Sequence, residues 1–210
     1  MFCDFKNENL KCVQRPAFTL LETLAALGIF ILILFVMSVF VNTIFSSNNI
    51  IYNQLSAQKE ARAAAENFVK EVRNASASSI GSYVIVGATA DSFTFYSDID
   101  FDSYMERVRY FVDGSNFKKG ALKPSGNPLT YNPVNETITI IVNDLTAGQQ
   151  PFLYYDKNYI GIGSALSFPV NVLNIRMAAL SLTIDKKQGV SPLPIIISAK
   201  TEIRNLKYAE

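Results

Sequence analysis

An uncharged apolar segment near the N-terminus constrains this chain more than any other feature. The segment from Thr23 to Phe45 contains no Asp, Glu, Lys or Arg, and its only polar side chains are Thr23, Ser38, Asn42 and Thr43. As an α-helix rising about 1.5 Å per residue, it is long enough to cross a hydrocarbon core of about 30 Å. The sequence therefore predicts a membrane-spanning helix.

Basic residues on one side of this segment predict its orientation. Lys6, Lys11 and Arg15 precede it, whereas the next basic residue after it is Lys59. Because flanking Lys and Arg are retained in the cytoplasm, we expect a single-pass membrane protein with a cytoplasmic N-terminus. The rest of the chain is then outside the cytoplasmic membrane.

Three other interpretations of the segment compete. A secretory signal peptide has an apolar region of about 7–15 residues followed by a small-residue cleavage site, but this run is longer and Ser46–Asn49 lacks that pattern. A buried core helix is disfavoured by the length. A plain signal anchor fits the hydropathy equally well, but it gives no reason for the acid Glu22 beside Leu21 and Leu24.

The residues around Glu22 carry a recognisable motif. Ala17–Glu22 (AFTLLE) and Ala25–Phe30 (AALGIF) closely resemble the class III signal of type IV prepilins and type II secretion pseudopilins. The resemblance implies that prepilin peptidase cuts on the cytoplasmic side, between Ala17 and Phe18, and that Phe18 becomes the N-methylated first residue. Residues 1–17 are then a leader peptide, and a pilin-like fold is expected.

The same resemblance makes Glu22 the fifth residue of the mature chain. Cleavage creates an α-amino group at Phe18 that is positively charged near neutral pH. When the helices of several subunits bundle, water is excluded, and the Glu22 carboxylate avoids a costly unpaired state by pairing with the amine of a neighbouring Phe18. Our hypothesis is that Glu22 sets the axial register during assembly.

Two departures from the family pattern refine the expectation. Ala17 stands where glycine is usual, and no proline occurs between Pro16 and Pro124, although major pilins usually carry one in the membrane helix. The chain therefore looks more like the minor pseudopilins of the I and J types. The partners implied are other pilin or pseudopilin subunits, the prepilin peptidase, an inner-membrane assembly platform, and membrane lipid before assembly.

The next segment, 46–75, is predicted to continue the helix with an amphipathic pattern because it contains no Gly or Pro. The expected apolar face consists of Ile51, Leu55, Ala61, Ala65, Phe68, Val69 and Val72. The expected polar face consists of Lys59, Glu60, Glu66, Lys70, Glu71 and Arg73. The alternative is a separate amphipathic helix after a break near Ser46–Asn49.

From 76 to 210 the chain changes to alternating apolar and polar residues separated by turns. Expected strands are Ser92–Tyr96, Arg107–Val112, Thr137–Val142, Leu180–Ile184 and Ile195–Ile203. Turn signals are Asp113–Ser115, Pro124–Pro128, Asn132–Pro133 and Ser191–Pro194. The expected fold class is therefore α+β: a transmembrane segment (18–45), its amphipathic continuation (46–75), and a mostly antiparallel head domain (76–210) that packs on the helix.

An acidic stretch in the head is a candidate metal site. Asp98, Asp100, Asp102 and Glu106 offer several carboxylate oxygens, as Ca²⁺ requires. The EF-hand pattern is not met, because Ser103 stands where glycine is needed and the last acid comes three residues early. The alternative is a solvated acidic connection in which Glu106 begins a strand. The solvated connection is the simpler interpretation, so we expect no cofactor, with calcium at these four acids as the alternative.

Two other functional classes are considered. Lys118, Lys119, Lys123, Lys186 and Lys187 could form a surface that contacts DNA, but a solvated face is the simpler interpretation, and the net charge of +1 supplies no general attraction to nucleic acid. The absence of histidine and of phosphate-loop or nucleophile motifs predicts that the chain is not an enzyme. The alternative to an assembly subunit is a membrane-tethered adhesin or DNA-capture subunit whose head carries the function.

Overall fold

A computed structural model describes residues 18–185 and 194–206. The leader residues 1–17, the lysines at 186 and 187, and most of the predicted turn Ser191–Pro194 lie outside the described residues. The chain divides into two compact units between Asn49 and Ile50, and each is considered by itself.

The N-terminal unit is helical. Helix α1 (Leu20–Arg73) includes residues 46–49, so the break considered above is absent from the secondary structure. Its part Leu20–Phe45 has a mean hydropathy of 3.0 and is long and apolar enough to span a membrane. None of this part is buried, which argues against a core helix. Thr23 and Thr43 donate their hydroxyl protons to carbonyl oxygens of the helix itself, at 2.9 Å each, so these two hydroxyls need no water.

The second unit contains a five-stranded antiparallel sheet in sequence order. Its strands are β1 (Ile85–Ala88), β2 (Ser92–Ser97), β3 (Glu106–Asp113), β4 (Asn116–Leu122) and β5 (Thr137–Val142). The predicted turn at Asp113–Ser115 joins β3 to β4, where Asp113 pairs with Asn116. Gly114 has a φ of +62°, which glycine adopts without steric cost.

A second, three-stranded antiparallel sheet completes the head. Its strands, in order, are β6 (Phe152–Tyr155), β7 (Met177–Ile184) and β8 (Ile195–Glu202). Short 3₁₀ helices lie at Pro133–Asn135 (η1), Val172–Asn174 (η2) and Arg204–Leu206 (η3). All five predicted strands are confirmed within a few residues. The strands β1, β4 and β6 were not predicted.

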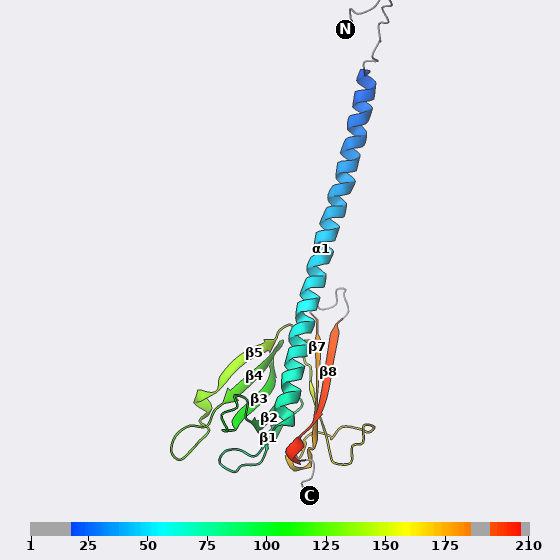
Figure 1. Cartoon of the computed structure of the whole chain (residues 1–210). Coiled ribbons are helices and arrows are strands. Elements are labelled where there is room, and N and C mark those ends of the chain that lie inside the picture. The colour runs from blue at the N-terminus through cyan, green and yellow to red at the C-terminus, as the bar shows by residue number, and fades with distance from the viewer. Residues whose placement is uncertain (1–17, 186–193, 207–210) are drawn as a thin grey trace, which may run out of the picture. The chain divides into compact units, whose positions relative to one another are not determined.

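The C-terminal part of α1 lies between the two sheets (Figure 1). Phe68 is fully buried, and its ring contacts Phe93 of β2, Tyr110 of β3 and Phe152 of β6, so one helix residue touches both sheets. The other buried helix side chains are small or branched: Ala57, Ala61, Ala64, Ala65 and Val72. The α+β fold class, with a helix packed on mostly antiparallel sheets, is therefore confirmed, and it fits a pilin-like fold.

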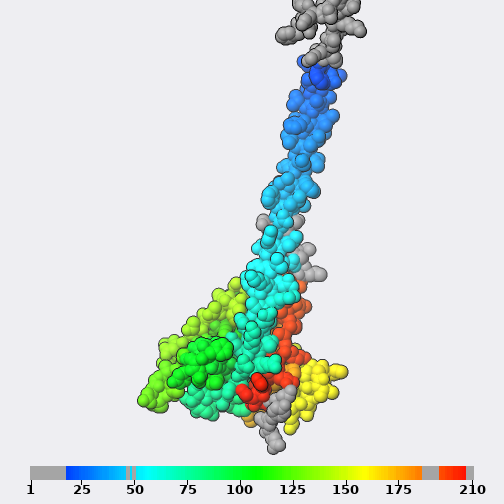
Figure 2. Space-filling view, viewed as in Figure 1, coloured from blue at the N-terminus to red at the C-terminus, as the bar shows by residue number. Residues whose placement is uncertain are grey.

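The predicted apolar face of the helix needs one correction. Ile51 and Leu55 were expected in the core, but they are 60% and 61% exposed, and the first buried residue of this unit's helix is Ala57. The sheets therefore cover α1 only from about Ala57 onward. Figure 2 shows that the outer side of the helix remains at the surface of the head, where Arg62 and Glu66 are exposed.

Candidate functional site

The first turn of α1 is built by Thr19. Its hydroxyl oxygen accepts a hydrogen bond from the backbone N–H of Glu22 at 3.3 Å, and its carbonyl oxygen accepts from Glu22 and Thr23 at 3.1 Å each. Thr19 is thus the N-cap, and Glu22 occupies the third helical position. This spacing is that of a capping box, in which an acid also interacts favourably with the positive end of the helix dipole. Glu22 thus stands where a negative charge favours the start of the helix, a position that sequence reasoning missed.

Phe18 and Glu22 both lie on the outside of the helix start. The Phe18 side chain is 78% exposed, immediately before the helix, and Glu22 is exposed one turn further on. Ala17, the other residue of the expected cleavage site, lies outside the described residues. The acid and the first residue expected in the mature chain are thus accessible to a second molecule at one end of an apolar helix.

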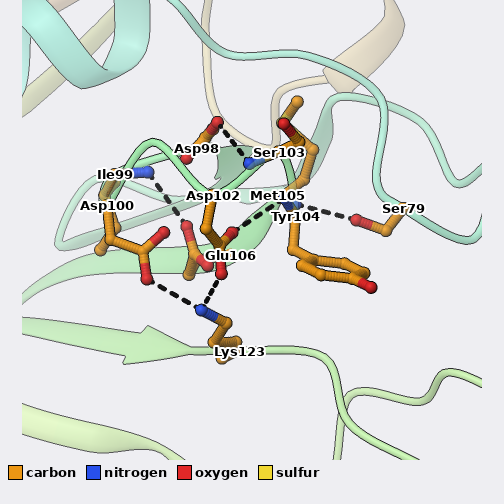
Figure 3. A network of polar contacts seen from close by, with 10 residues as sticks. All are labelled: Ser79, Asp98, Ile99, Asp100, Asp102, Ser103, Tyr104, Met105, Glu106 and Lys123. Carbon is orange, nitrogen blue, oxygen red and sulfur yellow. Dashed lines mark hydrogen bonds and ion pairs between the residues drawn. The ribbon is translucent and has the colours of Figure 1, made fainter.

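A second candidate site is the loop from Asp98 to Met105, which joins β2 to β3 (Figure 3). Its backbone is held by its own acids. The N–H of Ser103 donates to Asp98 Oδ2 at 3.1 Å, and the N–H of Tyr104 donates to Asp102 Oδ1 at 2.9 Å. Phe101 and Ser103 have φ values of +61° and +72°, so both adopt the left-handed backbone conformation. The two hydrogen bonds hold the loop in this conformation.

Lys123, which follows β4, closes the loop from the other side. Its ammonium group lies 2.9 Å from Asp100 Oδ2 and also contacts Asp102 Oδ2 (Figure 3). The hydrogen bond from Lys123 lowers the pKa of the Asp102 carboxyl, and the two aspartates raise the pKa of Lys123. Asp102 is therefore ionised at neutral pH, and its carboxylate shares the Lys123 ammonium group with that of Asp100.

Glu106 begins β3, as predicted, but it is buried rather than solvated, with 3% of its surface exposed. Its Oε2 accepts a hydrogen bond from the N–H of Ile99 at 3.0 Å, whereas its buried Oε1 has no partner among the described residues. The buried Oδ1 of Asp98 is in the same condition. Burial raises the pKa of the Glu106 carboxyl, and the negative charges of Asp100 and Asp102 add to this effect. Leaving a buried acceptor without a donor costs about 1–3 kcal/mol.

The structure brings together three of the four acids predicted as metal ligands. Carboxylate oxygens of Asp98, Asp100 and Glu106 all lie within 4.8 Å of one another. Asp102 does not belong to this group, and its carboxylate is instead bound by Lys123 and by the loop backbone. Three clustered carboxylates, of which Asp98 and Glu106 each have a buried oxygen without a described partner, are a donor set suited to a hard cation.

The lysines considered as a DNA-contacting surface are engaged elsewhere. Lys118 pairs with Asp113 at 2.5 Å, and Lys119 pairs with Glu71 of α1 at 2.5 Å. Lys123 pairs with the acidic loop, and the remaining two lysines lie outside the described residues. Each described member of this set is thus neutralised by an acid, which leaves little net positive potential there for a phosphate backbone.

A groove of about 590 Å³ lies between α1 and β8. Its helix side carries Arg62, Glu66 and Lys70, and its strand side is formed by residues 196–199. The charges alternate in sign, and its apolar lining includes Ala65 and Val69. The groove presents no arrangement of nucleophile and base, so its chemistry is that of a contact surface.

Comparisons with protein-family models and with curated proteins find no match to this chain. The fold and the first site define a class of protein. Its members have an α+β head and an N-terminal helix that is apolar enough to cross a membrane. A more particular function depends on the residues at the start of that helix.

Proposed function

We propose that this chain is a minor pilin or pseudopilin subunit. It is processed by prepilin peptidase between Ala17 and Phe18 and is assembled through its N-terminal helix into a type IV pilus or a type II secretion pseudopilus. The observation that carries the proposal is the exposed acid Glu22, which stands in the first turn of a helix that has no other charge up to Phe45. An antiparallel head on the same helix supports it.

The N-terminal helix is stabilised wherever its apolar surface is covered. The large side chains of the Phe18–Phe45 segment are exposed in the single chain, and each is stabilised by about 25 cal/mol per Å² when lipid or another helix removes it from water. In the bilayer the lipid provides this cover. In a filament neighbouring helices replace the lipid, so subunits exchange one apolar environment for another, and polar groups decide the register.

Glu22 is the polar group that sets the register between subunits. After cleavage, the Phe18 amine of one subunit neutralises the Glu22 carboxylate of its neighbour inside a bundle that excludes water. A subunit docked one helical turn out of place, by about 5.4 Å, leaves both charges unpaired. The Thr19 hydroxyl caps the first turn of the helix, so this hydrogen bond does not use the Glu22 carboxylate.

This proposal includes the location and the partners. The N-terminus is cytoplasmic until cleavage, the head lies outside the cytoplasmic membrane, and the subunit rests in lipid before assembly. Its partners are the prepilin peptidase, an inner-membrane assembly platform and other pilin or pseudopilin subunits. The reaction at Ala17–Phe18 is performed on this chain by the peptidase.

The test is the mass of the mature protein recovered from cells that contain a prepilin peptidase. We expect a chain that begins at Phe18 and carries one added methyl group. Deleting the peptidase should leave the full-length chain in the membrane. Functional material that keeps the opening Met1–Phe2–Cys3 would show the proposal to be wrong, because no amine would then form beside Glu22.

A further inference from the structure

We propose that the β2–β3 loop binds a divalent cation of the calcium type through Asp98, Asp100 and Glu106. This inference is independent of the proposed function, because it concerns the head rather than the membrane helix. It also differs from the expectation drawn from the sequence, which counted Asp102 as a ligand.

The first support is a buried carboxylate that lacks a partner. Glu106 is 3% exposed, and its Oε1 is buried without a hydrogen-bond donor among the described residues. Asp98 Oδ1 is likewise buried and unpartnered, and both residues belong to the group whose oxygens lie within 4.8 Å of one another. Two buried acceptors without a described donor in one acidic cluster call for an explanation, and a bound cation supplies it.

The second support is the way in which the loop holds its ligands. In both Asp98 and Glu106 one oxygen accepts a backbone N–H, from Ser103 and Ile99 respectively, while the other oxygen remains free. Metal-binding carboxylates are commonly oriented in this manner by hydrogen bonds to the oxygen that does not bind the ion. The loop thus fixes the direction of each carboxylate before a cation arrives.

Charge is the third support. The loop carries the four acids Asp98, Asp100, Asp102 and Glu106, whereas Figure 3 draws one ammonium group beside them, that of Lys123, which contacts Asp100 and Asp102. The four acids and one lysine have a formal excess of three negative charges, and a divalent cation offsets two of them.

The geometry favours calcium over magnesium. Oxygens on opposite sides of a Ca²⁺ ion are separated by about 5 Å, twice the usual Ca–O distance, and the three carboxylates lie within such a span. An irregular loop adapts to six or more ligands, and water completes the coordination shell. Mg²⁺ demands a smaller and more regular octahedron that this loop has no elements to impose.

Lys123 sets the strength of the site. Its ammonium group is bound to Asp100, one of the proposed ligands, and therefore competes with the cation for that carboxylate. We expect the affinity to be moderate, and we expect Lys123→Gln to increase it several-fold. A lysine that only ties the loop together would give the opposite result, because its loss would loosen the site.

The test uses the full chain in a non-ionic detergent. Tb³⁺ is added as a luminescent probe that Tyr104, within the loop, can sensitise, and Ca²⁺ is then titrated against it. We expect saturable luminescence that Ca²⁺ displaces, and an increase of a few degrees in the thermal midpoint with Ca²⁺. Glu106→Gln and Asp98→Asn should each weaken Ca²⁺ binding at least tenfold, whereas Asp102→Asn, the matched control in the same loop, should weaken it less than about threefold.

The alternatives have distinct outcomes. A wild-type chain that shows neither saturable Tb³⁺ luminescence nor a response to millimolar Ca²⁺ overturns the proposal. The same conclusion holds if Glu106→Gln is more stable than wild type while Ca²⁺ has no effect, because the position then does not need a negative charge. Equal losses for Asp102→Asn and Glu106→Gln would show that the ligand set is wrong. If Glu106→Gln fails to fold, Asp98→Asn and the wild-type titration decide.

Discussion

Lys119 Nζ of β4 lies 2.5 Å from Oε1 of Glu71 in α1, and the other oxygen of that carboxylate accepts the hydroxyl proton of Tyr110 at 2.8 Å. The side chains of Lys119 and Glu71 are only 21% and 16% exposed. The helical pattern had assigned Glu71 to the polar face, but its carboxylate points toward the sheet. This contact fixes the rotation of the helix against β3 and β4, because a turn of the helix would separate all three groups.

We expect Lys119→Met to destabilise the head by about 1–3 kcal/mol, because it leaves the shielded Glu71 charge without its cation. Glu71→Gln in the same chain should recover part of the loss, because the charge is then removed while an acceptor for Tyr110 remains. Urea unfolding of the full chain in detergent, followed by tyrosine fluorescence, measures both. Losses below about 0.5 kcal/mol for the single variant would mean that water replaces the lysine.

A second prediction concerns alkaline pH. Burial raises the pKa of Tyr110 and Tyr154 far above the ordinary value near 10, and the charges of Glu71 and Asp91, respectively, add to it. In the unfolded chain both phenols ionise near pH 10, whereas in the folded chain they stay neutral. Stability is therefore complete below pH 10 and falls above it, by about 1.4 kcal/mol per pH unit for each tyrosine.

Thermal melting between pH 9 and pH 11.5, together with tyrosinate absorbance, checks this expectation. Tyr154→Phe should make the alkaline loss of stability less steep, and two phenols should ionise only as the protein unfolds. If all ten tyrosines titrate before unfolding, the two hydroxyls are not shielded from water as their buried positions indicate.

The strands that sequence reasoning found and missed differ in a physical way. Strands such as Arg107–Val112 alternate between core and surface, so their period of two was visible. β4 (NFKKGAL) carries two adjacent lysines and a glycine, and its strand character comes from pairing with β3 and β5 rather than from its own composition. β6 has only four residues (FLYY), which do not alternate between apolar and polar, so its sequence does not distinguish a strand from a loop.

In the candidate sites, too, some features are visible in the local sequence and others depend on contacts between distant residues. Glu106 is in phase with the buried Val108 and Tyr110, so its burial could have been predicted from alternation. The capping spacing of Thr19 and Glu22 was also present in the sequence. By contrast, the pairing of Lys123 with Asp102 depends on the β3–β4 register and on a loop with positive φ values, neither of which local sequence determines.

A third prediction tests the outer face of the five-stranded sheet. A Cβ added at Gly120 would overlap the carboxyl group of Glu136, whose Cδ lies 2.9 Å from that position. Glu136 is held there by Arg109, with Nε–Oε1 and Nη2–Oε2 distances of 3.0 and 2.6 Å. We expect Gly120→Ala to displace Glu136 and to cost about 1–3 kcal/mol in unfolding free energy.

Two further variants make that prediction specific. Glu136→Ala should reduce the cost of Gly120→Ala, because the obstructing carboxylate is then absent. Gly87→Ala in β1 is the matched control, since a Cβ there meets nothing within 4 Å. Equal losses at the two glycines would indicate a general effect of alanine in these strands rather than the contact with Glu136.

The last prediction separates the two roles of Glu22. Glu22→Gln keeps a side chain that suits a capping box but removes the negative charge, whereas Thr19→Ala removes the capping hydroxyl and keeps the charge. If Glu22 sets the register by pairing with the Phe18 amine, Glu22→Gln should reduce incorporation into filaments at least tenfold while membrane insertion is unchanged. Thr19→Ala should cost about 1 kcal/mol of local helix stability and should assemble nearly normally. Fractionation of sheared filaments against membranes, with quantitative blotting, measures both. If Glu22→Gln assembled nearly normally and Thr19→Ala did not, assembly would depend on the capped start of the helix and not on the charge of Glu22.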